Sequence, residues 1–222
     1  MQRDLAGIDL VVGAKGSPLQ LILAGVFHID VPSGNIPRSA IKTLLEHPLV
    51  GRVVPLSLGD SLKGFRIVGT TLQYPALYGA QLAEGAYWQD QLQAVLGADV
   101  ARDTGLKTGD SFVGTHGLGA SGEAHGDTPY KVTGQLARCG CVLDRLVLTD
   151  LQSVWAVHET ATAVDDEDRK LLEAEREVTL LLVESGVCVD MVRPPVLLRC
   201  RRRAGRRDAA SVRAHRPPIV TT

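Results

Sequence analysis

The chain has 222 residues, of which 45% are hydrophobic and only 4% aromatic, so it can bury one core, or two small ones, built mostly from aliphatic side chains. Its net charge of −1 hides an asymmetry: residues 185–222 carry nine Arg against two Asp, whereas residues 1–184 hold 15 basic and 23 acidic side chains. The longest apolar stretch, Leu19 to Phe27, is about half of the roughly 20 residues that a membrane-spanning helix needs, and the N-terminus does not read as a signal peptide. We therefore expect the isolated chain to be soluble and to stay where it is made.

The first 75 residues predict the order β-α-β-β. The run "GIDLVVGAKG" is typical of a strand that ends at glycines, whereas "SPLQLILAGVFHI" fits either extended chain or a short amphipathic helix. In "PRSAIKTLLEHP" the apolar residues share one helical face, with Pro37 in the first turn and Pro48 closing the segment. The runs "GRVVPLSLGD" and "GFRIVGTTL" predict two strands joined by a hairpin turn at "DSLKG".

The following stretch alternates short strands and helices. We expect "YPALYGAQLAEGAYW" to be an irregular connection with exposed aromatic side chains, and "QAVLGADVARDTGLKTGDSFVGTH" to form strand, short helix, turn and strand. "PYKVTGQLA" and "RLVLTDLQSVWAVHE" predict two more strands, the second continuing into a helix near residues 151–158. "DDEDRKLLEAERE" indicates a solvated charged helix, and residues 178–183, "VTLLLV", a buried strand. This mixed order predicts an α+β domain with mainly short strands.

Residues 117–122, "GLGASG", match the spacing G-x-G-x-x-G of dinucleotide-binding loops. That loop needs a helix whose N-terminus receives the pyrophosphate, and "EAHGDTPYKVTG" carries Gly, Asp and Pro where the helix should run. We therefore expect a flexible connection between two antiparallel strands. "GAKGS" lacks the spacing of a phosphate-binding P-loop, so we expect no nucleotide cofactor.

A metal site is the first catalytic alternative. His116 and His125 flank the glycine-rich loop, with Glu123 and Asp127 nearby, and two imidazoles with a carboxylate can ligate zinc if the flanking strands form a hairpin. Loop histidines without a ligating role are far commoner. We therefore assign no metal ligand here.

Hydrolase chemistry is the second catalytic alternative. Ser57, Asp60 and Ser61 lack a G-x-S-x-G elbow and an identifiable partner histidine, so we interpret them as polar groups of a turn. We assign no catalytic and no cofactor-binding residue.

The four cysteines form no evident framework. Cys139 and Cys141 stand in a C-x-C arrangement unfavourable for a disulfide, and Cys188 and Cys200 lie in the C-terminal tail. We expect unpaired thiols. The tail itself, residues 185–222, is rich in Arg and Pro without periodicity, so we expect it to be disordered and to bind no specific nucleic acid.

Four segments taken together resemble a known family. They are "DLVVGAKGSPLQLILAGVFHIDVPSGNIP", "HPLVGRVVPLSLGDSLKGFRIVGTT", "VLGADVARDTGLKTGD" and "HGDTPYKVTGQLA…LDRLVLTDLQSVWAVHE". Over about residues 4–183 their order and spacing resemble the MacB-like periplasmic core domain of FtsX-like ABC transporter permeases. The resemblance implies an α+β unit with a porter-like βαβ part, residues 1–75 and 143–184, and a smaller inserted β-rich part, residues 76–142.

The resemblance also implies a function. In that family the domain lies between the first two transmembrane helices, faces the periplasm, has no catalytic residues, and relays motion from a cytoplasmic ATPase dimer to substrates or partner proteins. The partners implied are an ABC ATPase subunit, a second permease copy and a periplasmic partner or substrate, in export or lipoprotein handling. It further implies that Cys139 and Cys141 are incidental.

This chain departs from the family pattern at both ends. The transmembrane helices of the family are absent, and the resemblance stops after "VTLLLV", where the composition changes. We therefore expect a truncated product whose tail comes from an altered reading frame. The alternatives are a stand-alone module that binds a small molecule, peptide or lipid, and a metal-dependent enzyme that uses His116 and His125.

Overall fold

The computed structural model describes residues 3–5, 7–116, 128–159 and 176–185. All of these lie in one compact unit, residues 1–187. The glycine-rich motif at residues 117–122, most of the charged stretch before β11, and the tail from residue 186 onward lie outside the described residues.

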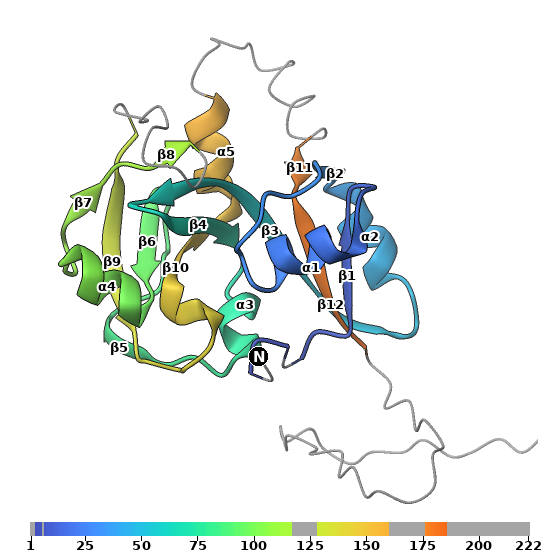
Figure 1. Cartoon of the computed structure of the whole chain (residues 1–222), viewed down its shortest axis with the longest axis horizontal. Coiled ribbons are helices and arrows are strands. Elements are labelled where there is room, and N and C mark those ends of the chain that lie inside the picture. Colours follow the sequence, from blue (N-terminus) through green and yellow to red (C-terminus); the bar gives the residue numbers. More distant parts are fainter. Residues whose placement is uncertain (1–2, 6, 117–127, 160–175, 186–222) are drawn as a thin grey trace, which may run out of the picture. The chain divides into compact units, whose positions relative to one another are not determined.

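Ten strands of the described residues form one mixed sheet (Figure 1). In spatial order the main path is β1 (Leu10–Gly13), β12 (Leu180–Ser185), β3 (Val50–Leu62), β4 (Phe65–Thr70), β10 (Leu146–Asp150), β6 (Gln93–Leu96), β9 (Tyr130–Leu136) and β5 (Leu82–Gly85). Off this path β7 (Ser111–Phe112) pairs with β9, and β8 (Thr115–His116) with β3. β2 (Ile36–Pro37) and β11 (Glu177–Val178) form a separate two-stranded ribbon.

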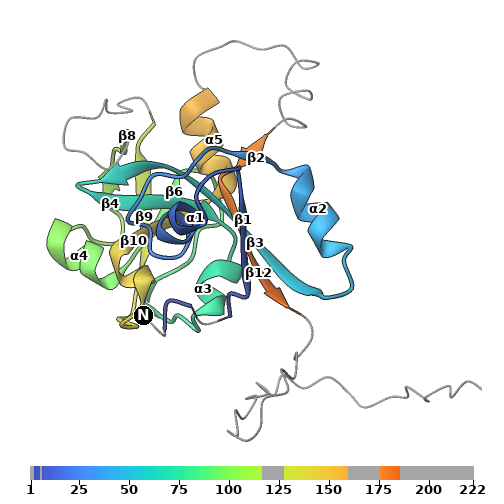
Figure 2. The same cartoon turned by 45° about the vertical axis from the view of Figure 1, so that its right-hand side comes forward.

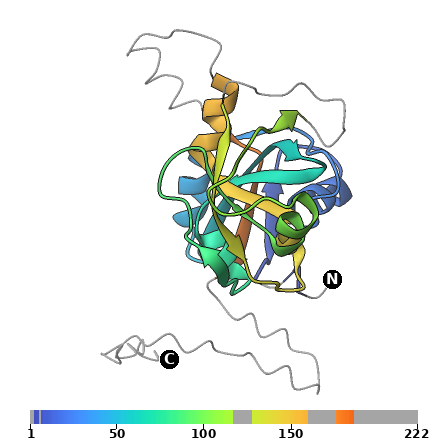
Figure 3. The same ribbon diagram turned by 90° about the vertical axis from the view of Figure 1, so that its left-hand side faces the viewer.

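The pairs β4–β10 and β6–β9 are parallel, and the other pairs are antiparallel. Figure 3, seen from the side of α4, shows β4 in teal and β10 in yellow side by side. In the described part of the chain five α-helices accompany these strands, so the predicted α+β class is confirmed.

The 13-residue strand β3 joins the edge pair β1–β12 to the rest of the sheet. Val53 and Leu56 pair with β12, and Ser57 and Leu62 pair with β4. Lys63 and Gly64 then turn the chain, with φ angles of 49° and 85°, as a two-residue hairpin turn requires. The predicted hairpin is confirmed, but its turn is shorter than expected because Asp60 to Leu62 continue the strand.

The helices are short. They are α1 (Pro18–Gly25), α2 (Ser39–Leu45), α3 (Gln73–Leu77), α4 (Ala98–Thr104) and α5 (Leu151–Glu159). α1 has proline in its first turn, where the missing N–H is not needed, which settles the open choice for this segment as a helix. Pro37, expected in the first turn of the next helix, instead lies in β2 opposite Glu177. Figures 1 and 2 place α2 beside β3, at the other end of the sheet from α4.

Aliphatic side chains fill the core. β12 is buried on both faces: Leu180 and Leu182 belong to one apolar cluster, Leu181 and Val183 to another. The buried strand expected at residues 178–183 is confirmed from Leu180 onward, whereas Val178 belongs to β11. The expectation of exposed aromatics after residue 73 is wrong for Tyr74, which is 0% exposed and packs in the first of these clusters.

Trp88 is buried in the same cluster as Tyr74. The stretch between these two aromatics contains a helix and a strand, α3 and β5, rather than a loop. Ordered elements of this kind direct large apolar side chains onto the sheet. Among the described residues, no helix has both the length and the apolar character needed to cross a membrane.

Candidate binding pocket

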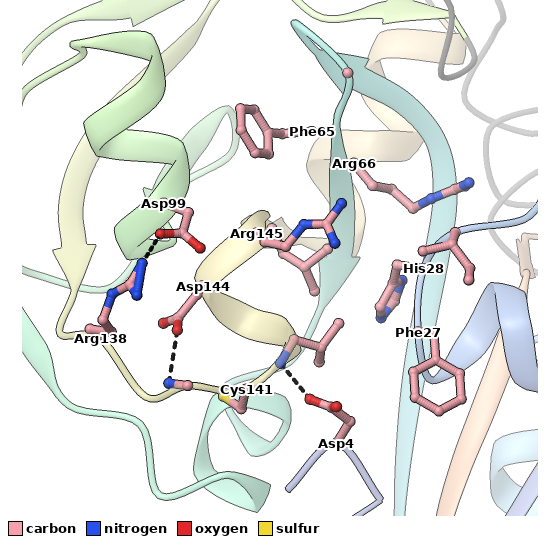
Figure 4. Close-up of a pocket in the computed structure, with 15 residues that line it drawn as sticks. Asp4, Phe27, His28, Phe65, Arg66, Asp99, Arg138, Cys141, Asp144 and Arg145 are labelled. Carbon is pink, nitrogen blue, oxygen red and sulfur yellow. Dashed lines mark hydrogen bonds and ion pairs between the residues drawn. The ribbon is translucent and has the colours of Figure 1, made fainter. Parts of the chain in front are cut away.

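A cavity of about 480 Å³ lies at the amino ends of the parallel strands β4 and β10 (Figure 4). Its wall is formed by the N-terminal segment, the loop after α1, the β3–β4 turn, α4 and residues 138–146. The lining residues are Asp4, Phe27, His28, Ile29, Gly64, Phe65, Arg66, Asp99, Arg138, Gly140, Cys141, Val142, Asp144, Arg145 and Leu146. The volume falls within the range of roughly 300–1,000 Å³ that is usual for ligand pockets.

Asp144 shapes one wall of the pocket. This carboxylate is only 4% exposed and accepts the backbone N–H groups of Cys139 at 2.9 Å and of Gly140 at 2.8 Å. Gly140 has a φ angle of 62°, the left-handed region that favours glycine. Further along the same loop, the backbone N–H of Val142 donates to Asp4 Oδ1 at 2.7 Å. Two carboxylates therefore fix a short loop that the hydrophobic pattern leaves undefined.

The same loop contains a disulfide. Cys139 and Cys141 are bonded, and their Cα atoms are 5.2 Å apart, within the usual range for such bonds. The expectation of unpaired thiols is wrong for this pair. The physical reason is the tight turn at Gly140, which Asp144 holds and which brings the two side chains together. Cys188 and Cys200 lie outside the described residues.

His28 is a buried neutral imidazole on the opposite wall. Its φ angle is 56°, its exposure is 6%, and its Nε2 lies 2.7 Å from the Tyr74 hydroxyl oxygen. Burial, and secondarily the positive charge of Arg66, lowers the pKa of His28 to about 3, so the ring is uncharged at neutral pH.

Hydrogen bonds hold the side chains around His28 in place. Tyr78 donates to the backbone carbonyl of Asp4 at 3.0 Å, because a carbonyl can only accept. His28 Nε2 and the Tyr74 hydroxyl share a hydrogen bond, and His28 Nδ1 is buried without a partner among the described residues.

Arg66 is a buried cation beside this imidazole. It is 5% exposed, its Nη2 donates to the backbone carbonyl of Asp30 at 2.8 Å, and its Nε is buried without an acceptor in the described part of the chain. Burial lowers the pKa of Arg66, and the charge of Asp30 opposes that shift. Arg66 is the register partner of Leu146 across the parallel pair, and Arg145 is the residue before Leu146.

Asp99 closes the pocket on the α4 side. It forms ion pairs with Arg102 at 2.6 Å and with Arg138, which brings α4 and the 138–146 loop together. Arg145 is exposed, and Figure 4 shows its side chain reaching from the 3₁₀ turn (Val142–Arg145) toward β4. The pocket therefore combines three acidic residues, three arginines and one neutral histidine.

The structure describes only one of the residues that the sequence suggested as metal ligands. His116 lies in β8, whose backbone pairs with Asp60 and Ser61 of β3, while His125, Glu123 and Asp127 lie outside the described residues. Within residues 3–5, 7–116, 128–159 and 176–185, no three His, Cys, Asp or Glu side chains are grouped as in a metal site. The zinc site remains an untested alternative, and we assign no metal ligand.

The interpretation of Ser57, Asp60 and Ser61 as turn residues is wrong. All three lie in β3, and they are 7%, 2% and 0% exposed. The strand continues to Leu62 because it pairs with both β4 and β8, which covers these side chains. Ser61 Oγ lies 3.4 Å from the Thr115 hydroxyl.

Sequence reasoning missed His28, Arg66 and Asp144. Arg66 did leave a signal, since it is one charge inside the otherwise apolar strand "FRIVGT", a pattern that favours either an edge position or a buried functional cation. His28 and Asp144 left none, because their partners are distant in sequence.

No protein-family model matches the chain, and no curated protein matches it in sequence. In structure it is similar to the periplasmic region of MacB from Actinobacillus actinomycetemcomitans, with 14% identity, a TM-score of 0.49, and coverage of 86% of this chain and 80% of that one. It is also similar to the extracellular domain of the noncanonic ABC-type transporter YknZ from Gram-positive bacteria, with 11% identity, a TM-score of 0.46, and coverage of 80% and 82%. A domain of a putative permease from Porphyromonas gingivalis shares 13% identity at a TM-score of 0.38, with coverage of 71% and 65%.

Proposed function

We propose that this chain is the extracytoplasmic domain of an ABC transporter permease, and that in the parent protein it couples ATP-driven motion to a substrate or partner outside the membrane. One structural observation carries this proposal. The described unit begins and ends at the same edge of its sheet, where β1 pairs antiparallel with β12 (Figure 1).

The two ends are held together by hydrogen bonds. The backbone N–H of Asp9 donates to the carbonyl of Val183 at 2.9 Å, and the backbone N–H of Ser185 donates to Asp9 Oδ2 at 2.7 Å. A domain inserted between two neighbouring membrane helices requires its first and last residues to lie close together. A pairing of the first strand with the last supplies that geometry directly.

The coupling role requires no reacting groups. A domain of this kind transmits a signal by shifting the population between two arrangements of its parts. We propose that the parts are a porter-like part, residues 1–75 and 143–184, and an insert, residues 76–142. The antiparallel pair β10–β6, with Leu148 opposite Val95, would then be their junction.

The proposed setting is the inner membrane, with this domain facing the periplasm. Its partners would be a cytoplasmic ATPase subunit, a second permease copy, and a substrate or protein on the periplasmic side. We propose that the chain has no catalytic activity of its own. The support is the family resemblance together with the pairing of β1 and β12.

The flanking DNA tests this proposal. The DNA on both sides, read in all three frames, is expected to encode membrane-spanning segments next to residues 1 and 185, with an ATPase gene alongside. A tagged chain expressed from its own locus is expected to co-purify with that ATPase. Flanking DNA without any such segment, and a tagged chain that purifies alone, would overturn the proposal.

The pocket favours a second candidate function, a stand-alone module that binds a small molecule, peptide or lipid. A cavity of about 480 Å³ with buried polar groups is the specific observation behind it. The metal-dependent alternative predicts stoichiometric zinc in the purified chain that is lost on His116→Ala. Elemental analysis of both proteins distinguishes this alternative from the others.

A further inference from the structure

We propose that the pocket at the amino ends of β4 and β10 binds a ligand with a carboxylate or phosphate group, which Arg66 and Arg145 hold, and an apolar part that lies against Phe27 and Phe65. This goes beyond the coupling role, which requires no ligand in this pocket. The site is defined by the residues shown in Figure 4.

The carboxylates of the pocket are already engaged by groups of the chain. Asp144 accepts two backbone N–H groups, and Asp4 accepts the N–H of Val142. Asp99 is paired with Arg102 and Arg138, so the charge of Arg138 is also matched. These acidic groups therefore serve to build the wall, and they are poorly placed to receive a cationic ligand.

Two guanidinium groups of the wall, those of Arg66 and Arg145, have no carboxylate paired with them in the described part of the chain. The carboxylate that acts on Arg66 is Asp30, whose Oδ1 accepts the backbone N–H of Val31. Both side chains line the same cavity, Arg66 from β4 and Arg145 from the 3₁₀ turn just before β10.

A buried cation without a paired anion destabilises the fold. Arg66 is 5% exposed, and its Nε–H has no acceptor among the residues that the structure describes. A guanidinium binds a carboxylate or phosphate through two parallel N–H···O bonds, which no neutral ligand group reproduces. His28 is neutral at pH 7 and neither repels nor neutralises an anion beside Arg66. The chemistry of this wall selects an anion.

The rest of the cavity selects an apolar body. Phe27, Ile29 and Phe65 line it, together with Val142 and Leu146. The side chain of Ile29 is 58% exposed, so this apolar wall continues to the surface. A pocket with a charged anchor and aromatic walls is the usual arrangement for a small amphiphilic ligand.

Calorimetric titration of the full chain tests the proposal. Octanoate and octyl phosphate are expected to bind saturably with one site per chain. Octanol has the same apolar body without the charge, and its affinity is expected to be at least about tenfold lower. Arg145→Ala, at an exposed position, is expected to weaken octanoate binding about tenfold while leaving the circular dichroism spectrum unchanged. Arg52→Ala is the matched control, because it removes one guanidinium from β3 outside the pocket.

A second variant probes the buried partner. Arg66→Lys keeps the charge but loses the planar fork, so octanoate is expected to bind more weakly than to the unchanged chain.

Vesicles of phosphatidylglycerol and of phosphatidylcholine distinguish the two sources of the anion, a lipid headgroup and a free anion. Sedimentation with phosphatidylglycerol alone, reduced by Arg145→Ala, assigns a lipid headgroup; saturable binding of octanoate or octyl phosphate without vesicle binding assigns a free anion.

Three results would overturn the proposal. They are octanol binding as tightly as octanoate, equal effects of Arg145→Ala and Arg52→Ala on octanoate affinity, and no saturation by either anion below about 10 mM together with no binding to the anionic vesicles. None of these measurements involves an ATPase or a membrane segment. A negative result in these binding experiments therefore does not contradict the proposed coupling role, and a failure of the coupling role does not contradict ligand binding in the pocket.

Discussion

The edge formed by β1, β12 and β3 and the pocket at the amino ends of β4 and β10 are held by different forces. At the edge, Leu180, Leu181 and Leu182 are all at most 1% exposed and pack on both faces of β12. At the pocket, the buried groups are polar: His28 and Arg66 each keep one nitrogen without a partner among the described residues. Burial of the leucines at the edge stabilises the fold, whereas burial of polar groups without partners at the pocket destabilises it. Proteins keep such unfavourable groups chiefly where they serve a function.

The largest effect is expected at the edge. Leu182→Ala removes a fully buried side chain and leaves a cavity, so the free energy of unfolding is expected to fall by about 2–5 kcal/mol in urea denaturation. Leu10→Ala is the control in the neighbouring strand, because Leu10 is 52% exposed. A change there of more than about 0.5 kcal/mol, or a similar loss in both variants, would contradict the packing described.

Asp144 gives the next largest effect, at the pocket. Asp144→Ala leaves the backbone N–H groups of Cys139 and Gly140 without their acceptor, so a loss of about 2–3 kcal/mol is expected. Asp144→Asn keeps an acceptor oxygen and is expected to lose less. Asp103→Ala, on the exposed side of α4, is the control. An unaffected free energy of unfolding in Asp144→Ala would show that the wall does not depend on this carboxylate.

The pH dependence of stability distinguishes the two regions further. The pKa of His28 is about 3 in the folded chain against 6.5 for an ordinary histidine, so the unfolded chain binds the proton more readily below pH 6.5. His28 therefore contributes stability above pH 6.5 that is lost as the pH falls toward 3. Between pH 7 and pH 5 the free energy of unfolding is expected to fall by about 2 kcal/mol because of this group.

The variant His28→Gln should remove that part of the pH dependence, whereas His47→Gln, at an exposed position in the α2–β3 connection, should leave it unchanged. Denaturation curves at both pH values measure it. An equal pH dependence in all three proteins would mean that His28 is not buried in its neutral form.

The disulfide is expected to give the smallest effect. Cys139 and Cys141 are two positions apart, so their bond closes a very short loop and removes little entropy from the unfolded chain. Replacing both with serine is expected to cost about 1–1.5 kcal/mol. Alkylation of the unreduced, unfolded chain followed by peptide mapping checks the bond itself. Rapid labelling of both residues without a reducing agent would contradict it.

The two regions also differ in how much of them the sequence predicts. Strand β12 and the β3–β4 hairpin follow from local patterns, an apolar run and a turn at Lys63–Gly64, and both elements were predicted, with the strand beginning at Val178 and the turn at Asp60. The pocket wall could not be predicted in this way. Asp4 and Val142 are 138 positions apart, and His28 and Tyr74 are 46 apart, so no local spacing reveals their contacts.

The cysteine pair shows the same limit at short range. Its spacing argued against a bond, and only the turn that Asp144 holds at Gly140 makes the bond possible. The pairing of β1 with β12 was likewise not predicted, although both strands were. Two correctly identified strands at opposite ends of a segment do not indicate that they are neighbours. This pairing is nevertheless the observation on which the proposed function rests.

The most direct test of that function is the membrane topology of the protein expressed from its own locus, with the DNA on both sides retained. Alkaline phosphatase, which is active only outside the cytoplasm, is inserted at the exposed hairpin turn Lys63–Gly64, and a fluorescent protein that matures only in the cytoplasm is inserted there in a parallel strain. The proposal predicts active phosphatase in the membrane fraction and no fluorescence. Inactive phosphatase with a fluorescent, cytosolic product would contradict it.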